Sequence, residues 1–215
     1  MSEKLETRVI AGQTLVELGH EFPDLVVIGG DLNKSTHANK FGTEFPDRFF
    51  DFGPAEQNMV SVAAGMAASG KIPIVSTFSV FATSRPYDQI RLGLAQSSLN
   101  VKIVATHAGI ITGEDGISAH SIEDIALMTA LPNFKVIVPS DGIETVPALR
   151  EAILTDGPVY IRLSRPATTV VHENNCDFEI GKAEKLRNGS DATIIACGIM
   201  VDAAIKAASS LASED

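Results

Sequence analysis

The chain has 215 residues, of which 45% are hydrophobic and 20% are charged, so its composition supports one packed domain, or one with part of a second, and excludes wholesale disorder. Its formal net charge of −10, from 17 basic and 27 acidic side chains, argues against nucleic acid as a general partner. No apolar run approaches the roughly 18 residues of a membrane span, and the N-terminal MSEKLETR has no apolar signal core.

Helices and short strands alternate along the sequence from residue 7 to residue 164. Helices are predicted at residues 7–20, 54–68, 86–97, 121–130 and 143–154, and strands at 24–30, 49–52, 72–78, 101–109, 134–140 and 158–164. The strands are continuous apolar runs, as expected when both faces of a sheet are covered. This order predicts an α/β fold with right-handed crossovers and a mostly parallel sheet of about six strands with helices on both faces.

The predicted helix 54–68 has proline near its first turn and stops at Gly70. Its interior consists almost entirely of small or apolar residues. This composition predicts a helix that is buried on most of its sides.

The regular alternation of helices and strands stops after about residue 165. Residues 166–190 are mixed, polar and rich in turn formers, and they are followed by one more predicted strand (191–198) and helix (199–211). A single strand and helix cannot close a domain. The expected organisation is therefore a first domain over residues 1–166, a linker over 167–190, and only the beginning of a second α/β domain over 191–215.

Polar residues gather where several predicted strands end. In parallel sheets, ligands bind beyond the carboxyl ends of the strands. Four polar stretches fall there, at residues 31–35, 77–84, 107–120 and 164–165. Their convergence predicts a binding site at this edge of the sheet.

Glu56, Phe78 and Phe81 each allow two interpretations. Glu56 begins the helix of small residues, where the helix dipole favours an acid; alternatively, it is a partly buried carboxyl that exchanges a proton with a heteroaromatic ligand. Phe78 and Phe81 follow a predicted strand and form either ordinary core or a stacking wall for a planar ring.

The segment THAGIITGEDGISAH, residues 106–120, contains three glycines that permit tight turns and close ligand approach. Glu114 and Asp115 lie between two of them, but their spacing does not match an EF-hand and the acids are too few for a calcium cage. The segment is either a solvated turn or a ligand-binding loop.

Candidate anion-binding cations are Arg8, Lys34, Arg85 and Arg165. Arginine binds phosphate through two N–H groups, although each of these residues is, by itself, also an ordinary surface cation. The sequence has neither GxxxxGK[ST] nor a GxGxxG after a strand, which excludes an ordinary nucleotide site.

Taken together, these stretches resemble the C-terminal half of transketolase, and specifically the C-terminal subunit of split transketolases. The likeness runs from about residue 7 to residue 165 and continues more weakly to the end. It is carried by TRVIAGQTLVEL, GGDLNKST, FFDFGPAEQNMVSVAAGMAASGKIPIVSTFSVFATSRPYDQIR, THAGIITGEDG, IEDIALMTALPNFKVIVPSD and IRLSRP. In that family, this region is the pyrimidine-binding domain of a thiamine diphosphate enzyme.

The resemblance implies a set of cofactor-binding residues. Glu56 matches the glutamate that bonds the aminopyrimidine ring, where a protonated carboxyl favours the imino tautomer whose nitrogen removes the C2 proton of the thiazolium. Phe78 and Phe81 match aromatic positions around that ring. Asp31 matches an acid near the cofactor at the subunit interface.

The resemblance also implies substrate-binding and catalytic residues. Asp115 matches the acid that contacts the donor's hydroxyl next to the bond being cleaved, and His107 and His120 are the candidate catalytic histidines. The positions expected to hold the sugar phosphate are Arg8, Ser35, His107 and Arg165.

Two positions depart from the family pattern. The family's histidine after GEDG falls on Ala119, with His120 one position later. Ser84 stands where yeast-like transketolases carry a tyrosine near the pyrimidine. Both departures bear on the choice of donor and acceptor sugar.

The family holds the diphosphate through Mg²⁺ on another domain, with a GDG motif followed by an asparagine, and this sequence has no such motif. The resemblance therefore implies half of an active site. A separate N-terminal transketolase subunit would carry the GDG motif and bind Mg²⁺, and two copies of each chain would form a heterotetramer that shares thiamine diphosphate between subunits. The expected activity is transfer of a two-carbon ketol unit between phosphosugars.

Three alternatives stay open. A deoxyxylulose-phosphate synthase usually has DRAG where this chain has THAG, and the GxxG…QHSQ pattern of a 2-oxoacid dehydrogenase beta subunit is missing. A non-catalytic scaffold subunit is favoured by Ala119 but opposed by the intact Glu56, Phe78, Asp115 and Arg165.

The two cysteines, Cys176 and Cys197, lack metal-site spacing and suit a reducing compartment. The sequence thus predicts a cytoplasmic location and no metal ligands in this chain.

Overall fold

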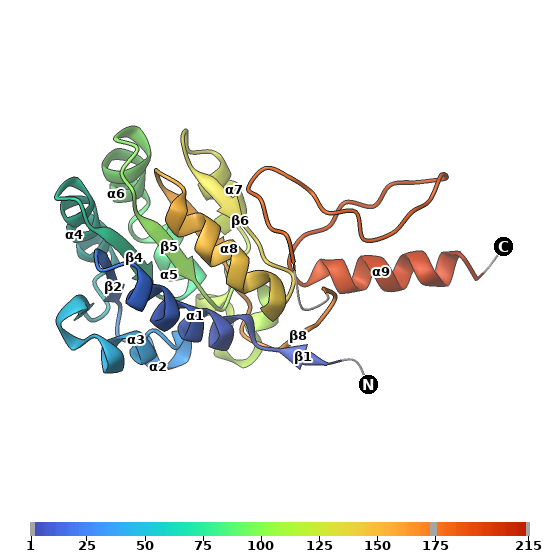
Figure 1. Ribbon diagram of the computed structural model, residues 1–215, viewed down its shortest axis with the longest axis horizontal. Helices are drawn as coiled ribbons and strands as arrows, with labels where there is room; N and C mark the ends of the chain where they lie inside the picture. The colour runs from blue at the N-terminus through green and yellow to red at the C-terminus, as the bar shows by residue number, and fades with distance from the viewer. Residues whose placement is uncertain (1–2, 173–175, 214–215) are drawn as a thin grey trace.

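The body of the protein is a parallel sheet that is covered by helices on both faces (Figure 1). The structure is a computed structural model, which describes residues 3–172 and 176–213. The strands are β2 (Leu25–Gly29), β3 (Phe49–Asp51), β4 (Ile72–Ser76), β5 (Lys102–Ala105), β6 (Lys135–Ile137) and β7 (Val159–Arg162). These six strands lie in the order β3-β2-β4-β5-β7-β6, and every neighbouring pair is parallel. The expected α/β fold class is confirmed.

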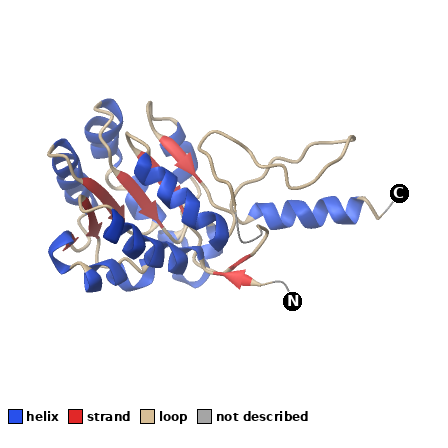
Figure 2. Ribbon diagram, in the orientation of Figure 1, coloured by secondary structure: helices blue, strands red, loops and turns tan. Residues whose placement is uncertain are grey.

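The helices alternate with the strands along the chain (Figure 2). They are α1 (Thr7–Glu21), α2 (Asn33–Thr36), α3 (Asn39–Glu44), α4 (Glu56–Ala68), α5 (Ser79–Ser84), α6 (Tyr87–Gln89), α7 (Asp124–Thr129), α8 (Gly142–Leu154) and α9 (Met200–Leu211). The predicted helix 86–97 is divided, because α6 passes into a π-helix over Ile90–Gln96. Among the described residues, no helix is long and apolar enough to cross a membrane.

Two hydrophobic clusters hold the helices to the sheet. On one face, α1 and α8 contribute buried residues such as Leu15 and Leu149, which pack with Val27 and Ile161 of the strands. On the other face, α4, α7 and the π-helix cover the sheet, with Met59 among their buried residues. The long helices α1, α4 and α8 each bury one stripe of residues, as expected of a helix that packs on one side.

The prediction that α4 is buried on most sides is wrong for this chain. Its buried residues are Glu56, Met59, Val60 and Ala63, whereas Gln57, for example, is exposed. The spacing of the buried residues is that of a single helix face, which packs on the sheet. The small residues on the opposite side face solvent in the isolated chain.

The expected strand at 191–198 is absent, although the following helix is present as α9. Residues 191–197 are exposed, and no described strand pairs with them. A single segment without a neighbouring strand has no partner for its backbone groups. Figures 1 and 2 show α9 and the segment before it projecting away from the sheet.

The expected linker begins in contact with the first domain. Thr168–Thr169 forms β8 and pairs antiparallel with β1 (Lys4–Leu5). Phe178 and Ile180 pack against the core cluster beside α1 and α8. The domain boundaries remain predictions. Each of the three expected segments includes a few residues outside the described part of the chain, namely 1–2, 173–175 and 214–215.

Candidate active site

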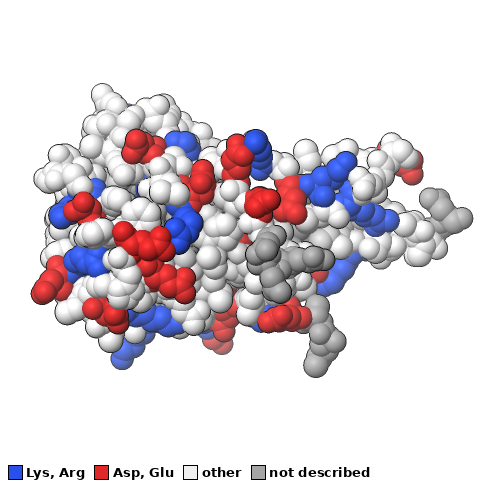
Figure 3. Space-filling model, in the orientation of Figure 1, with Lys and Arg blue, Asp and Glu red and all other residues white. Residues whose placement is uncertain are grey.

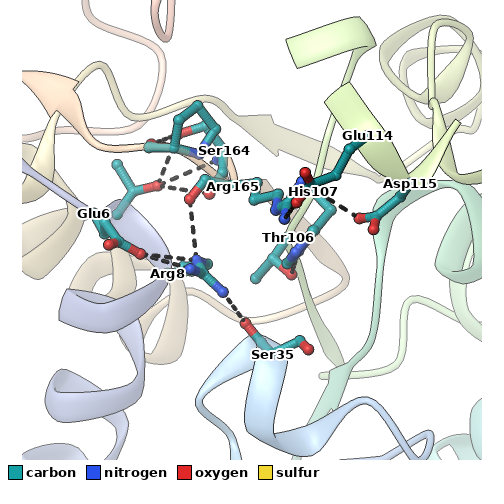
Figure 4. A network of polar contacts seen from close by, with 11 residues as sticks. Glu6, Arg8, Ser35, Thr106, His107, Glu114, Asp115, Ser164 and Arg165 are labelled. Atoms are coloured by element: carbon teal, nitrogen blue, oxygen red, sulfur yellow. Dashed lines mark hydrogen bonds and ion pairs between the residues drawn. The ribbon is translucent and has the colours of Figure 1, made fainter. Parts of the chain in front are cut away.

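The polar residues predicted to converge do meet at the carboxyl edge of the sheet. Arg8 lies in α1, Ser35 in α2, His107 two residues after β5 and Arg165 three residues after β7. Figure 4 shows these four residues close together, although Arg8 and Arg165 are separated by 157 positions in the sequence.

Arg8 ties three segments together. Its Nη1 donates to the carbonyl oxygen of Ser35 at 2.8 Å, and its Nε donates to the carbonyl oxygen of Arg165 at 3.0 Å. Its Nη2 pairs with Glu6 Oε2 at 2.7 Å. Because these acceptors fix the guanidinium plane, Arg8 presents its remaining N–H groups in a defined direction.

Arg165 holds the glycine-rich loop against the same site. Its Nη1 donates to the carbonyl oxygen of Thr112 at 2.7 Å, and its Nη2 pairs with Glu114 Oε1 at 2.5 Å. Asp115 Oδ2 lies 3.8 Å from Nη1. The loop that carries Asp115 is therefore positioned by the arginine that is expected to bind the substrate phosphate.

His107 is the buried centre of this cluster. Its Nδ1 shares a hydrogen bond of 2.8 Å with Thr106 Oγ1, and its ring stacks on Phe78 with 3.6 Å between centroids. Burial, followed by the charges of Arg8 and Arg165, lowers the pKa of His107 to about 3. The imidazole is neutral at physiological pH, so it interacts with an anion by donating a hydrogen bond and not as a cation.

Two non-glycine residues at the site have left-handed backbone conformations. Asp31 has φ of 59° and His107 has φ of 57°. Such conformations are uncommon outside glycine and are often found at functional sites. The turn at Asp31 is held by Asp51, whose Oδ1 accepts from the Asp31 amide at 3.0 Å and whose Oδ2 accepts from Asn33 Nδ2 at 2.7 Å.

Asp31 itself is exposed. It lines an open hollow together with Lys34, Ser35 and Phe49. Ser35, which lines this hollow, is also the residue whose carbonyl oxygen accepts a hydrogen bond from Arg8. The candidate cofactor residue and the candidate phosphate residues therefore border one another.

Glu56 and the two phenylalanines form a second part of the site. Glu56 is the first residue of α4 and is 3% exposed, and its Oε1 pairs with Arg85 Nη1 at 2.8 Å. The Phe78 and Phe81 rings are nearly parallel, with 6.0 Å between centroids. Since Phe78 also stacks on His107, one row of rings links the carboxylate region to the Arg8 and Arg165 cluster.

His120 lies at the end of the glycine-rich loop and does not join the cluster. Its Nε2 is 3.0 Å from the carbonyl oxygen of Gly113. Ala119, which occupies the family's histidine position, is 5% exposed. The loop thus buries Ala119, and the His120 imidazole points toward the backbone of the loop and not toward the cluster.

Asp124 organises a buried network that no sequence motif revealed. Its Oδ2 accepts from Ser79 at 3.3 Å, from Tyr160 at 2.7 Å and from Arg162 Nε at 2.7 Å. Burial, with a further contribution from the Asp124 charge, raises the pKa of Tyr160. Because Ser79 directly follows Phe78, this network fixes the start of α5. The only signal in the sequence is the position of Asp124 within IEDIALM.

A separate cluster joins the 176–184 segment to the first domain. The ligand-type atoms of His172, Cys176 and Glu184 lie within 4.8 Å of one another, and His172 Nδ1 pairs with Asp141 Oδ2 at 3.1 Å. Burial raises the pKa of the Cys176 thiol to about 11. The cysteine is therefore a neutral thiol at physiological pH, which is a weak nucleophile.

Comparison with known proteins gives a consistent result over most of the chain. Residues 3–170 match the family described as the transketolase pyrimidine-binding domain. The chain is 50% identical over 198 residues to a putative transketolase C-terminal section of Methanocaldococcus jannaschii, a match that covers 91% of this chain and 63% of the relative. It is 40% identical over 200 residues to a 6-deoxy-6-sulfo-D-fructose transketolase subunit of Clostridium sp. (strain MSTE9), covering 93% of this chain and 62% of that protein.

The structural comparison agrees with the sequence comparison. A solved structure described as a split gene transketolase, inactive beta4 tetramer, superposes with a TM-score of 0.89 and 46% identity, covering 99% of this chain and 69% of that chain. The chain therefore spans just under two thirds of the two sequence relatives and somewhat more of this structural neighbour.

Proposed function

Because this chain belongs to the transketolase pyrimidine-binding domain family, we propose that it is a subunit of an enzyme that transfers a two-carbon ketol unit between phosphosugars. The transketolase names of its sequence relatives and structural neighbour support this activity. One observation carries the proposal: the buried Glu56 is connected through Arg85 to the Phe78 and Phe81 pair, and Phe78 stacks on His107 of the Arg8 and Arg165 cluster.

The residues around Glu56 fit the pyrimidine end of thiamine diphosphate. A buried carboxyl group can hold a proton against a ring nitrogen, and parallel aromatic rings provide a flat apolar surface for a planar ring. Thiamine diphosphate, when bound, supplies the carbon that carries the two-carbon unit. The role proposed for this chain is to bind and orient the ring, with Glu56 as the proton-holding group and Asp31 nearby at the subunit interface.

The Arg8 and Arg165 cluster fits the phosphate group of the sugar. Two guanidinium groups supply charge and directed N–H donors, and Ser35 and the neutral His107 supply further polar contacts. Arg165 is paired with Glu114, so an anionic substrate would compete with that carboxylate. Two arginines in one place can capture an anion locally although the chain as a whole is acidic.

The glycine-rich loop is proposed to contact the sugar chain. Asp115 is assigned to the donor's hydroxyl next to the bond being cleaved. His120 is assigned a catalytic role, which requires its ring to leave the carbonyl of Gly113. A sulfonate would fit the same two arginines as a phosphate, and one relative is named for a sulfo sugar.

We propose that the active enzyme needs a second chain. An N-terminal transketolase subunit with the GDG motif would bind the diphosphate through Mg²⁺, and two copies of each chain would form a heterotetramer in the cytoplasm. The relative named as a C-terminal section and the split gene neighbour support this arrangement. That neighbour is described as an inactive beta4 tetramer, which is consistent with a site that one kind of chain cannot complete.

The test is the Glu56→Gln variant in the assembled two-chain enzyme. Loss of a proton-holding group costs roughly 10²- to 10⁴-fold in rate, so turnover should fall by at least about 100-fold. Glu17→Gln makes the same change at an exposed position of α1 and should leave turnover unchanged. Near-normal turnover of Glu56→Gln would contradict the role assigned to Glu56.

A further inference from the structure

Arg85 makes contacts that the proposed function has not used. It directly follows α5, and its Nη1 pairs with Glu56 Oε1 at 2.8 Å. Its guanidinium carbon lies 4.1 Å from the centroid of the Phe81 ring. Arg85 therefore contacts both the carboxylate and one of the aromatic rings that the proposed site assigns to the pyrimidine.

The two side chains of the Glu56–Arg85 ion pair differ in how far they are buried. The Glu56 side chain is 4% exposed, whereas the Arg85 side chain is 48% exposed. A buried carboxylate is costly unless a charged partner compensates it. Within the described residues, Arg85 is the only ion-pair partner of Glu56, so this contact fixes the orientation of the carboxyl group.

Arg85 is also held by contacts other than the ion pair. A guanidinium group that lies over an aromatic ring is held by its planar face and can still donate along its edge. The backbone carbonyl oxygen of Arg85 accepts a hydrogen bond from Gln57 Nε2 at 3.2 Å, which ties the end of α5 to the first turn of α4. Lysine could supply the charge but not the flat stacking on the ring.

The Glu56 carboxylate has one oxygen engaged and one available. Oε1 is held by Arg85, and no hydrogen bond within the described residues engages Oε2. Because the contact with Arg85 fixes Oε1 and the plane of the carboxylate, the direction of Oε2 is fixed as well.

We propose that Arg85 is a positioning residue, which holds Oε1 of Glu56 and directs Oε2 toward the ring nitrogen of the aminopyrimidine. The inference rests on the proposed function, because it presumes that Glu56 binds this ring. The proton shared between Glu56 and the ring nitrogen then lies on the Oε2 side, away from the guanidinium. The contact improves binding of the cofactor and the removal of its C2 proton, and Arg85 makes no contact with the sugar.

The experiment compares Arg85→Gln and Arg85→Lys in the assembled two-chain enzyme. Two quantities are measured without any sugar: the dissociation constant of thiamine diphosphate by calorimetry in the presence of Mg²⁺, and the rate at which the C2 proton of the bound cofactor exchanges with deuterium, by NMR. Loss of one charge-assisted hydrogen bond is worth about tenfold or more. Arg85→Gln should therefore raise the dissociation constant and slow the exchange, each by about tenfold, with the KM for the sugar phosphate unchanged.

Arg85→Lys should recover part of both losses, since it restores the charge but not the planar contact. The matched control is Arg150→Gln, which breaks an exposed ion pair with Glu21 far along α8 and should leave both quantities at the wild-type values. Arg85 is half-exposed, and melting curves of the complex check that the variants are folded.

Dissociation constants and exchange rates of Arg85→Gln within about twofold of the wild type would overturn the inference. Tighter binding or faster exchange would overturn it as well, because Arg85 would then be a competitor that the cofactor displaces. If the wild-type complex binds thiamine diphosphate and Glu56→Gln does not, the proposed function stands whatever Arg85→Gln does. If the wild-type complex fails to bind thiamine diphosphate, the proposed function itself is wrong.

Discussion

At the scale of single residues, the site depends on polar groups whose charge state is set by burial. His107 is 2% exposed and lies near Arg8 and Arg165, so the folded protein resists its protonation. The pKa of His107 is lowered from 6.5 to about 3. Between these two values the unfolded chain binds a proton that the folded protein does not, and the stability falls as the pH falls.

The first prediction concerns this loss of stability. At pH 5 the contribution of His107 amounts to about 2 kcal/mol, at 1.36 kcal/mol per pH unit below 6.5. His107→Gln keeps a neutral polar side chain and removes the titration. The variant should therefore lose about 2 kcal/mol less than the wild type between pH 7 and pH 5, as measured by urea unfolding at the two pH values. Equal losses in both proteins would show that His107 is not held neutral.

The second prediction concerns Arg165 and the sugar phosphate. Replacing Arg165 by Ala in the assembled enzyme removes a charge-assisted contact, and the KM for a ketose phosphate should rise by about tenfold or more. An unphosphorylated ketose serves as the control substrate, because it cannot make this contact and its kinetics should change little. An equal effect on both substrates would assign Arg165 to loop structure and not to phosphate binding.

At the scale of elements, helix ends and loops place the site residues. The start of α8 is a clear case, because Asp141 Oδ1 accepts from the Glu144 amide at 2.9 Å and Oδ2 accepts from the Val171 amide at 2.7 Å. Burial alone would raise the pKa of Asp141, but hydrogen bonds from His172 and from three backbone amides hold it at about 2. One carboxylate thus caps α8 and ties down the segment after β8.

The third prediction follows from this contact. Asp141→Asn should lower the free energy of unfolding at pH 7 by about 2 kcal/mol, which is typical of a buried cap whose charge-assisted bonds are lost. Thermal melting measures the change, with Asp47→Asn at an exposed position as the matched control. Since the pKa of Asp141 lies below its unfolded value of 3.8, its contribution is present above about pH 4 and should disappear as the pH falls toward 2. An unchanged melting temperature would show that Asp141 does not stabilise α8.

Much of the element structure could be predicted from the sequence, because helix and strand periods are local properties. The apolar spacing of α1 and the β-branched runs of β2 and β5 are sufficient to place them. The two wrong predictions, on the strand at 191–198 and on the burial of α4, depend on contacts between residues that are far apart in the sequence. The segment 191–198 has the composition of a strand but finds no neighbour among the described strands, and the pattern of α4 does not reveal that one side faces solvent.

The same distinction applies to the site. The resemblance identifies Arg8 and Arg165, but no local pattern shows that Arg8 bonds the carbonyl of Arg165, 157 positions away. The pairing of Glu56 with Arg85 and the network around Asp124 were missed for the same reason. Gly12 gives no signal either, although a Cβ there would lie 2.6 Å from the His37 Cβ, so its lack of a side chain brings α2 close to α1.

At the scale of the whole molecule, the distribution of charge separates the surface from the site. Figure 3 shows acidic and basic side chains intermixed over the face that it draws, and the formal net charge is −10. The site places two arginines, each paired with a glutamate, around a neutral histidine. This pattern favours a small anionic substrate held at one point over an extended polyanion.

The central claim is that this chain contributes one half of a two-chain transketolase site. The most direct measurement is the transfer of a labelled two-carbon unit from a ketose phosphate to an aldose phosphate, with thiamine diphosphate and Mg²⁺ present. The assay compares this chain, the protein that co-purifies with it from its own cells, and the two together. We expect transfer only by the mixture, and its loss when the mixture contains Glu56→Gln. Transfer by the co-purified protein alone, or by the mixture regardless of Glu56, would contradict the claim.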